Sequence, residues 1–294
     1  MRKCSVETDK DGVRRLFLNG KPYYQNGVLD QGYWPDGLYT APSNEALIYD
    51  IQTMKNLGFN MIRKHVKVET ARWYYHCDRL GMIVWQDMVN GGTYNAPFMT
   101  WLPALFPKFK LHTSDRIHPL FGRKNVHGRE EFIRECKETV TALKAFPCIS
   151  TWVIFNEGWG QFDSKKLTAL FRELDDTRLI DSASGWFDRR QGDFKSEHNY
   201  FAKQFVTPSD RAFVISEYGG YTCQVKGHTC SGKTYGYKIC SSQEEFQAAY
   251  HKLMSEEIDP LKEQGLCGAV YTQLSDIEDE INGLMTYDRE VCKL

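Results

Sequence analysis

The chain has 294 residues, of which 41% are hydrophobic and 14% aromatic, so it can enclose a substantial core. This length lies near the roughly 250 residues typical of an α/β barrel, and it excludes a disordered chain or a small disulfide-stapled module. The 37 basic and 38 acidic side chains nearly cancel. This balance argues against nucleic acid or an anionic membrane as a partner and favours a neutral small molecule.

The amino terminus lacks the apolar run of a secretory signal, and no stretch of about 18 apolar residues occurs. The nine cysteines are odd in number and form no C-x-x-C pair, which favours a reducing compartment. We therefore expect a soluble, cytoplasmic protein with no membrane partner. The sequence leaves its oligomeric state open, and a homo-oligomer is one alternative.

Short apolar runs alternate with longer helical patterns, which is typical of βα units around a parallel sheet. In chain order we expect a strand at 23–28, a helix between Ser43 and Gly58, a strand at 59–63, a helix at 70–80, a strand at 82–85, a helix at 130–144, a strand at 149–155, a helix at 164–175, strands at 178–180, 196–200 and 213–216, a helix at 243–263 and a strand at 268–272. Eight such strands predict an α/β fold, a closed (β/α)8 TIM barrel.

Two links in this barrel are too short or too rich in Gly and Asp to predict full helices, namely those that join the fifth, sixth and seventh strands. No repeat or linker divides the chain, so we expect a single domain over residues 1–294. The connection at 87–129 is long for a βα loop and is rich in aromatic residues: Phe98, Trp101, Phe106, Phe109 and Phe121. We expect it to form a functional loop at the carboxyl ends of the strands.

Polar side chains gather where the predicted strands end. They are Asp30 after the first strand, Arg63 and His65 after the second, Gln86 and Asp87 after the third, Asn156 and Glu157 after the fourth, Glu197, His198 and Tyr200 on the sixth, Glu217 after the seventh, and Gln273 and Asp276 after the eighth. In a barrel these ends converge on one mouth. Glu157 and Glu217 should therefore face each other.

Two facing carboxyl groups suit cleavage of a glycosidic bond, which needs an acid for the leaving oxygen and a carboxylate for the cationic sugar carbon. A separation of about 5 Å allows covalent capture and retention, whereas about 6.5–9.5 Å leaves room for water and inversion. A lone glutamate at a strand end is usually a solvated loop residue. Two of them, on the right strands and in Gly- and aromatic-rich surroundings, favour a catalytic pair.

Several blocks resemble glycoside hydrolase family 2. Trp-Val-Ile-Phe-Asn-Glu-Gly-Trp-Gly at 152–160 resembles its acid/base motif, and Ile-Ser-Glu-Tyr-Gly-Gly at 215–220 resembles its nucleophile motif. Leu-Asn-Gly-Lys-Pro at 18–22 is similar to its barrel entry, and Gly-Phe-Asn-Met-Ile-Arg at 58–63 to its second strand. The likeness runs over residues 16–293. Members of the family include β-galactosidases, β-glucuronidases and β-mannosidases.

The resemblance implies that Glu157 is the general acid/base and Glu217 the nucleophile of a retaining mechanism. Asn156 would hydrogen-bond the sugar 2-hydroxyl, and Arg63 would keep Glu217 ionised, because a nearby guanidinium favours a charged carboxylate.

Further predicted substrate-binding residues are Asp30, Asp87, His198, Tyr200, Trp186, Gln273 and Asp276. Trp159 and Trp85 are further candidates for stacking on a sugar face. Each of these side chains has an alternative role as ordinary packing or as a structural ion pair.

Departures from the family pattern narrow the hypothesis. Gln273 stands where many relatives place a Trp, and the Asn-x-Lys motif that reads a glucuronate carboxylate is not evident after the eighth strand. The Glu-x-His pattern of magnesium ligands is absent after the third strand, so we expect no metal and no cofactor. Cys223, His228, Cys230 and Cys240 match no common zinc spacing. Relatives carry β-sandwich domains ahead of the barrel, and this sequence begins almost at the barrel itself.

The sequence therefore predicts a retaining β-glycosidase for a neutral sugar, most similar to a β-galactosidase, with a carbohydrate as its partner. One alternative is a non-catalytic carbohydrate-binding barrel or an inactive fragment of a larger glycosidase. A metal-dependent hydrolase is disfavoured, because the eight histidines are scattered and do not form an H-x-H motif at a strand end.

Overall fold

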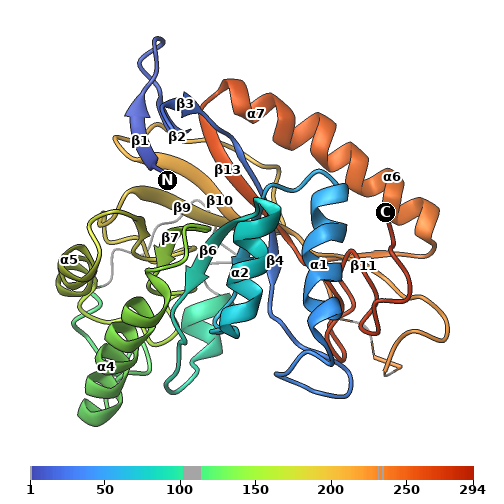
Figure 1. Cartoon of the computed structure of the whole chain (residues 1–294), viewed down its shortest axis with the longest axis horizontal. Coiled ribbons are helices and arrows are strands. Elements are labelled where there is room, and N and C mark those ends of the chain that lie inside the picture. Colours follow the sequence, from blue (N-terminus) through green and yellow to red (C-terminus); the bar gives the residue numbers. More distant parts are fainter. Residues whose placement is uncertain (1, 102–113, 231, 234) are drawn as a thin grey trace.

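A computed structural model describes residues 2–101, 114–230, 232–233 and 235–294. Its central feature is a parallel sheet of eight strands that curls into a nearly closed barrel (Figure 1). In chain order these strands are β4 (Gln25–Asp30), β5 (Met61–Lys64), β6 (Ile83–Asp87), β7 (Ile149–Val153), β8 (Leu179–Asp181), β9 (Phe194–Asn199), β10 (Ala212–Gly219) and β13 (Leu266–Thr272). The eight-stranded α/β barrel is confirmed.

The barrel wall runs in the order β8, β7, β6, β5, β4, β13, β10 and β9, so β8 and β9 meet at a seam. Asp193, just before β9, crosses this seam. Its amide donates to the carbonyl of Ile180 at 2.8 Å, and its carboxylate accepts from the Ile180 amide at 2.7 Å. One aspartate therefore supplies the bonds that a regular ladder would otherwise provide.

Helices pack on the outside of the strands (Figure 1). They are α1 (Asn44–Asn56), α2 (Ala71–Leu80), α4 (Val126–Leu143), α5 (Ser164–Leu174), α6 (Gln243–Leu253) and α7 (Asp259–Glu263), with a π-helical turn, η2 (Met254–Ile258), between the last two. The Ser43 and Ser242 hydroxyls cap α1 and α6 by accepting backbone N–H bonds. The predicted helix at 243–263 is thus interrupted by one π-helical turn.

The described chain has no helix between β8 and β9 or between β9 and β10, in line with the weak helical signal there. The connection after β6 contains a second π-helical turn, η1 (Pro97–Trp101), and its Phe98 and Phe121 pack against Phe187. Phe106 and Phe109 lie outside the described residues, as does the side chain of Trp101. None of the helices in the described ranges is long and apolar enough to cross a membrane.

A small antiparallel sheet precedes the barrel, and the sequence analysis did not predict it. It consists of β1 (Cys4–Thr8), β2 (Arg14–Leu18) and β3 (Lys21–Pro22). The turn between β1 and β2 is held by Asp9, whose carboxylate accepts from the Asp11 and Val13 amides. These strands are short and half-exposed, so their hydrophobic alternation is too weak to stand out in the sequence. A separate parallel pair, β11 (Tyr221–Cys223) and β12 (Lys238–Cys240), was likewise not predicted.

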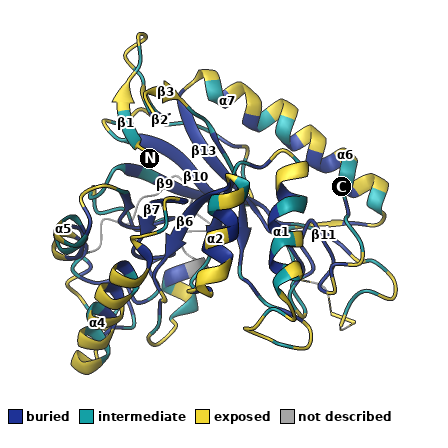
Figure 2. Cartoon of the chain, in the orientation of Figure 1, coloured by how far each residue is buried: buried dark blue, intermediate teal, exposed yellow. Residues whose placement is uncertain are grey.

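Alternation along each strand builds the barrel interior in layers. Met61, Trp85 and Val214 belong to an apolar interior cluster, whereas Ile62 and Val84 pack in the cluster that the helices cover. Figure 2 shows the strands as the most buried part of the fold. Two residues further along β5 and β6, the same alternation brings Arg63 and Asp87 into the interior at the carboxyl end. Because every second side chain of a strand points into the barrel, a polar layer lies above an apolar layer in the interior.

Packing in the apolar interior layer should contribute strongly to the free energy of unfolding. Trp85 is fully buried there, packs on Phe194 and donates its indole N–H to Gln25 Oε1 at 2.6 Å. Trp85→Ala is expected to lower the free energy of unfolding by about 3–5 kcal/mol, measured by urea denaturation. Leu38→Ala, at a side chain that is 57% exposed, is the control and should change it by less than about 0.5 kcal/mol. Equal losses in the two variants would contradict this layering.

Candidate active site

Arg63 is the centre of the polar layer and is completely buried. Its guanidinium donates to Asp87 Oδ1 and Oδ2 at 3.0 and 2.9 Å, to Asn156 Oδ1 at 2.8 Å, to Glu217 Oε1 at 3.0 Å and to the Ser216 carbonyl at 3.0 Å. Burial acts to raise the pKa of Asp87, but Arg63 and His65 outweigh it and hold that pKa below its usual value. One cation thus fixes side chains from three elements of the mouth, namely β6, the turn after β7 and β10.

Glu217 lies on β10 at a bulge, where Ser216 and Glu217 together face His198 of β9. An extra residue at this point re-aims the strand, and both side chains bond to groups of the barrel mouth. Besides Arg63, Glu217 accepts from the Tyr200 hydroxyl, with Oε2 at 2.5 Å. Tyr200 stacks on Tyr237 with ring centroids 3.8 Å apart. Glu217 is therefore a carboxylate held by a cation on one oxygen and by a phenol on the other.

Glu157 follows β7 in the left-handed region, with φ of 53°, and its amide donates to the Ser184 carbonyl at 2.9 Å. The next residue, Gly158, also has a positive φ, and a Cβ there would lie 2.4 Å from the Phe187 ring. A side chain at 158 would therefore displace the turn that presents Glu157. Positive φ at a non-glycine residue is uncommon and is often found at functional sites.

The carboxyl groups of Glu157 and Glu217 lie close together. One carboxyl oxygen of Glu157, one of Glu217 and a ring nitrogen of His198 all lie within 4.8 Å of one another. Burial raises the pKa of Glu157 to about 7, although His65 and Arg63 act to lower it. The pair therefore combines a carboxyl group that is still partly protonated near neutrality with one that is bonded directly to a guanidinium. In the described part of the chain, these three side chains are also the group close enough to share a metal ion, but the 2.9 Å hydrogen bond between His198 and Glu157 accounts for their closeness.

The structure brings Asn156, Arg63, Asp87, His198, Tyr200 and Trp186 together with Glu157 and Glu217. Trp186 donates its indole N–H to the His198 carbonyl at 3.0 Å. Trp159 lies at the rim, beside Tyr94. Trp85 lies instead in the apolar layer below the site, so it does not present a face to a sugar.

Asp30 and Asp276 do not join this cluster, because each is held by a buried lysine. Lys64 Nζ lies 2.5 Å from Asp30, and Lys293 Nζ lies 2.7 Å from Asp276. Burial raises the pKa of Asp276 to about 6, although Lys293 opposes that effect. The structure thus places these two carboxyl groups in ion pairs that anchor the ends of β4 and β13.

Gln273 follows β13 and belongs to a closed ring of four polar side chains that the sequence analysis missed. Gln31 Nε2 donates to Gln273 Oε1 at 3.0 Å and to Glu280 Oε2 at 3.2 Å. Asn282 Nδ2 donates to Glu280 Oε1 at 3.1 Å, and Asn282 Oδ1 accepts from Gln273 Nε2 at 2.8 Å. Gln273 was predicted from its place after the eighth strand, whereas Gln31, Glu280 and Asn282 were not predicted. Burial raises the pKa of Glu280, with His65 and Glu217 near enough to affect it.

The cysteine-rich segment does not form one cluster. Cys223 and Cys240 are register partners on β11 and β12 and are buried, whereas Cys230 is exposed. His228 bonds to Asp288 at 2.8 Å.

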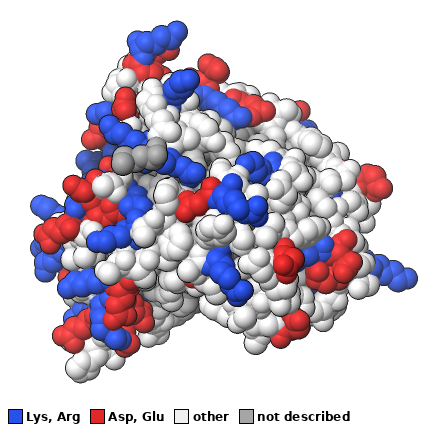
Figure 3. Space-filling model, in the orientation of Figure 1, with Lys and Arg blue, Asp and Glu red and all other residues white. Residues whose placement is uncertain are grey.

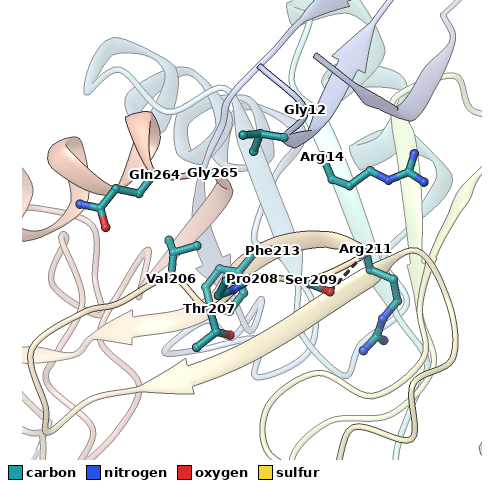
Figure 4. Close-up of a pocket in the computed structure, with 11 residues that line it drawn as sticks. Gly12, Arg14, Val206, Thr207, Pro208, Ser209, Arg211, Phe213, Gln264 and Gly265 are labelled. Carbon is teal, nitrogen blue, oxygen red and sulfur yellow. Dashed lines mark hydrogen bonds between the residues drawn. The ribbon is translucent and has the colours of Figure 1, made fainter. Parts of the chain in front are cut away.

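A hollow of about 390 Å³ lies at the opposite end of the barrel from the carboxylates, where Val206, Phe213 and Gly265 stand at the amino ends of β10 and β13 (Figure 4). Figure 3 shows acidic and basic side chains interspersed on one face, which fits the near-zero net charge.

A (β/α)8-type barrel with two close carboxyl groups at its carboxyl end belongs to the class of barrel glycosidases. The family model described as "Glycosyl hydrolases family 2, TIM barrel domain" matches residues 10–293. The chain therefore belongs to glycosyl hydrolase family 2.

Among curated proteins, a β-galactosidase from Lactococcus lactis is 32% identical over 128 residues, which are 38% of this chain and 13% of that protein. A β-galactosidase from Priestia megaterium is 24% identical over 248 residues, which are 78% of this chain and 21% of that protein. This chain thus spans about a fifth or less of these relatives.

Solved structures share the fold. A family 2 β-galacturonidase from Eisenbergiella tayi, bound to galacturonate, has a TM-score of 0.70 at 17% identity, covering 98% of this chain and 52% of that one. A Bacteroides uniformis β-glucuronidase bound covalently to cyclophellitol-6-carboxylate aziridine has a TM-score of 0.66 at 17% identity, covering 98% and 36%. At these identities the likeness establishes the barrel fold.

The buried guanidinium should be essential to stability. Arg63→Met leaves Asp87 and Glu217 without their cation and is expected to lower the free energy of unfolding by about 3–5 kcal/mol at pH 7, measured in urea. The native pKa of Asp87 is lowered, so its contribution is complete above the unfolded value near 4 and is lost as the pH falls through the native value. The difference between the wild type and the variant should therefore narrow below about pH 4.

Arg134→Met is the matched control, because Arg134 pairs with Glu131 on the exposed face of α4. This variant should change the free energy of unfolding by less than about 0.5 kcal/mol at either pH. If Arg63→Met were as mild as Arg134→Met, Arg63 would not be the cation that stabilises the mouth.

Proposed function

We propose that this chain is the catalytic barrel of a retaining β-glycosidase that hydrolyses O-glycosides of a neutral sugar, most similar to a β-galactosidase. The observation that carries the proposal is the close pair formed by Glu157 and Glu217, whose carboxyl oxygens approach within 4.8 Å. Separations of about 5–5.5 Å between the carboxyl groups are typical of retaining enzymes, because no water fits between nucleophile and sugar.

In the first step, a Glu217 oxygen attacks the anomeric carbon while Glu157 gives its proton to the departing glycosidic oxygen. In the second, Glu157 as a carboxylate takes a proton from water, which attacks the same carbon and releases Glu217. Asn156 Oδ1 already accepts from Arg63, which leaves its Nδ2 group to donate to the sugar 2-hydroxyl. Each step is complete with these side chains and water, so it requires no metal or organic cofactor.

The carboxyl group of Glu280 favours a neutral sugar over a uronic acid as the substrate. The structural neighbours include a β-galacturonidase and a β-glucuronidase, and the matched curated proteins include β-galactosidases and a putative β-glucuronidase. A uronate carboxylate entering this mouth would meet Glu217, Asp87 and Glu280, and the guanidinium of Arg63 is already shared among its partners. The hydroxyl groups of a neutral sugar can instead donate to the Glu280 oxygens.

The carboxylate roles can be tested with an activated aryl β-galactoside and with a 2-deoxy-2-fluoro galactoside. Glu217→Gln is expected to abolish turnover, and Glu157→Gln to lower kcat/KM by about 10²–10⁴-fold on a substrate whose leaving group needs a proton. The fluoro sugar should label Glu217 covalently in the wild type, as mass spectrometry of peptides would show. Sugar binding without an adduct would favour the carbohydrate-binding barrel, and near-normal turnover in both variants would contradict the mechanism.

Charge at Glu280 should set selectivity against uronides. Glu280→Gln keeps the side-chain shape and removes the charge, so the ratio of kcat/KM for an aryl β-glucuronide to that for the β-galactoside should rise about tenfold. Glu290→Gln, at an exposed glutamate near the carboxyl terminus, is the control and should leave that ratio unchanged. A wild-type enzyme that prefers the glucuronide would overturn the assignment of a neutral sugar.

A further inference from the structure

His198 touches both catalytic carboxyl groups. Its Nδ1 lies 2.9 Å from Glu157 Oε1, and its Nε2 lies 2.9 Å from the Ser184 hydroxyl and 3.5 Å from Glu217 Oε1. Burial lowers the pKa of His198 to about 3, so the ring is neutral and carries one N–H. The nitrogen that carries this hydrogen decides whether Glu157 donates to the ring or accepts from it.

The hydrogen bonds of three serines determine which nitrogen of His198 carries the hydrogen. Ser184 Oγ donates to Ser216 Oγ at 2.9 Å, and Ser196 Oγ donates to the same oxygen at 2.6 Å. Ser216 in turn donates to the backbone carbonyl of Glu197 at 3.4 Å. A serine hydroxyl has one hydrogen, so Ser184, having given its hydrogen to Ser216, can only accept at His198.

The bond between Ser184 and His198 determines the tautomer of the imidazole ring. The N–H of His198 must lie on Nε2, which leaves a lone pair on Nδ1. Two acceptors cannot share the 2.9 Å contact between Nδ1 and Glu157 Oε1, so the hydrogen in that contact belongs to Glu157.

We propose that Ser184 and Ser216 are positioning residues that fix the Nε2–H tautomer of His198, so that its Nδ1 holds the proton of Glu157. This role rests on the proposed glycosidase function. When Glu157 gives its proton to the glycosidic oxygen, the new carboxylate faces a lone pair and regains a proton readily from the attacking water. His198 itself neither gains nor loses a proton in either step.

Other charged groups also act on this contact. The titratable side chains that face Glu157 or His198 are Arg63, His65, Asp87, Glu217, Tyr200 and Tyr237. None of them bonds to the Ser216 hydroxyl among the described contacts, so a substitution of Ser216 leaves their charges in place. A change in the ionisation of Glu157 in such a variant therefore reports on the tautomer.

The decisive variant is Ser216→Ala. Without the Ser216 oxygen, the Ser184 hydroxyl is free to donate to Nε2, which permits the Nδ1–H tautomer to donate to the Glu157 carboxylate. The basic limb of kcat/KM for an aryl β-galactoside should then move to lower pH by about one unit, with KM nearly unchanged. In ¹⁵N-histidine spectra of the full chain, the protonated nitrogen of His198 should change from Nε2 to Nδ1.

Ser196→Ala is the matched control, because it removes the other hydroxyl on Ser216, which also bonds to the buried Asp181 carboxyl group, and leaves the path from Ser216 to His198 intact. It should alter neither the basic limb nor the tautomer. Equal shifts in both variants, or an unmoved limb and tautomer in Ser216→Ala, would overturn the proposal.

The wild-type spectrum tests the assignment even if a variant fails to fold, with His198 assigned by the loss of its signals in His198→Gln. An Nε2–H ring supports the proposal and an Nδ1–H ring refutes it. A wild-type chain without turnover on any aryl glycoside would refute the proposed function, and the same spectrum would still decide the tautomer.

Discussion

The mouth of this barrel depends on the burial of one guanidinium. Arg63 has no exposed surface, so its charge is tolerable only because acceptors surround it on every side. Those acceptors come from β6, from the turn after β7 and from β10. The positions of Glu217 and of Asn156, the residue before Glu157, are therefore tied to the same cation. A barrel supplies such a centre naturally, because alternate residues of parallel strands converge on its axis.

Around this cation, two chemically identical side chains acquire different properties. Glu217 is bonded to Arg63 and to the Tyr200 phenol, both of which donate to it. Glu157 has no direct bond to the guanidinium and meets a neutral imidazole instead, and burial raises its pKa to about 7. The division of labour that we propose between an acid and a nucleophile thus arises from which partner each carboxyl group meets.

Much of this site could be predicted because strand ends in a parallel barrel converge. That rule and the motif resemblance predict Glu157, Glu217, Asn156, Arg63 and Asp87 at one mouth, and the structure brings these side chains together there. The rule could not reveal that Asp30 and Asp276 are held by lysines, since Lys293 approaches from the chain terminus.

Residues outside the strand ends were harder to foresee. Glu280 and Tyr237 come from loops, where hydrophobic periodicity gives no register. The Ser216 bulge was equally invisible, because a strand with one extra residue has the same composition as one without it.

The seam between β8 and β9 is the least regularly hydrogen-bonded part of the barrel wall. Ser184, His198 and the backbone that holds Glu157 all lie along this part of the wall, where the described chain interposes no helix and Asp193 replaces ladder bonds. Arg63 and Glu217 belong instead to strands that are paired on both sides. Local opening should begin where cross-strand bonds are fewest. On warming, the protein should lose control of its proposed proton donor while the proposed nucleophile is still in place, so that substrates with good leaving groups are the last to be turned over.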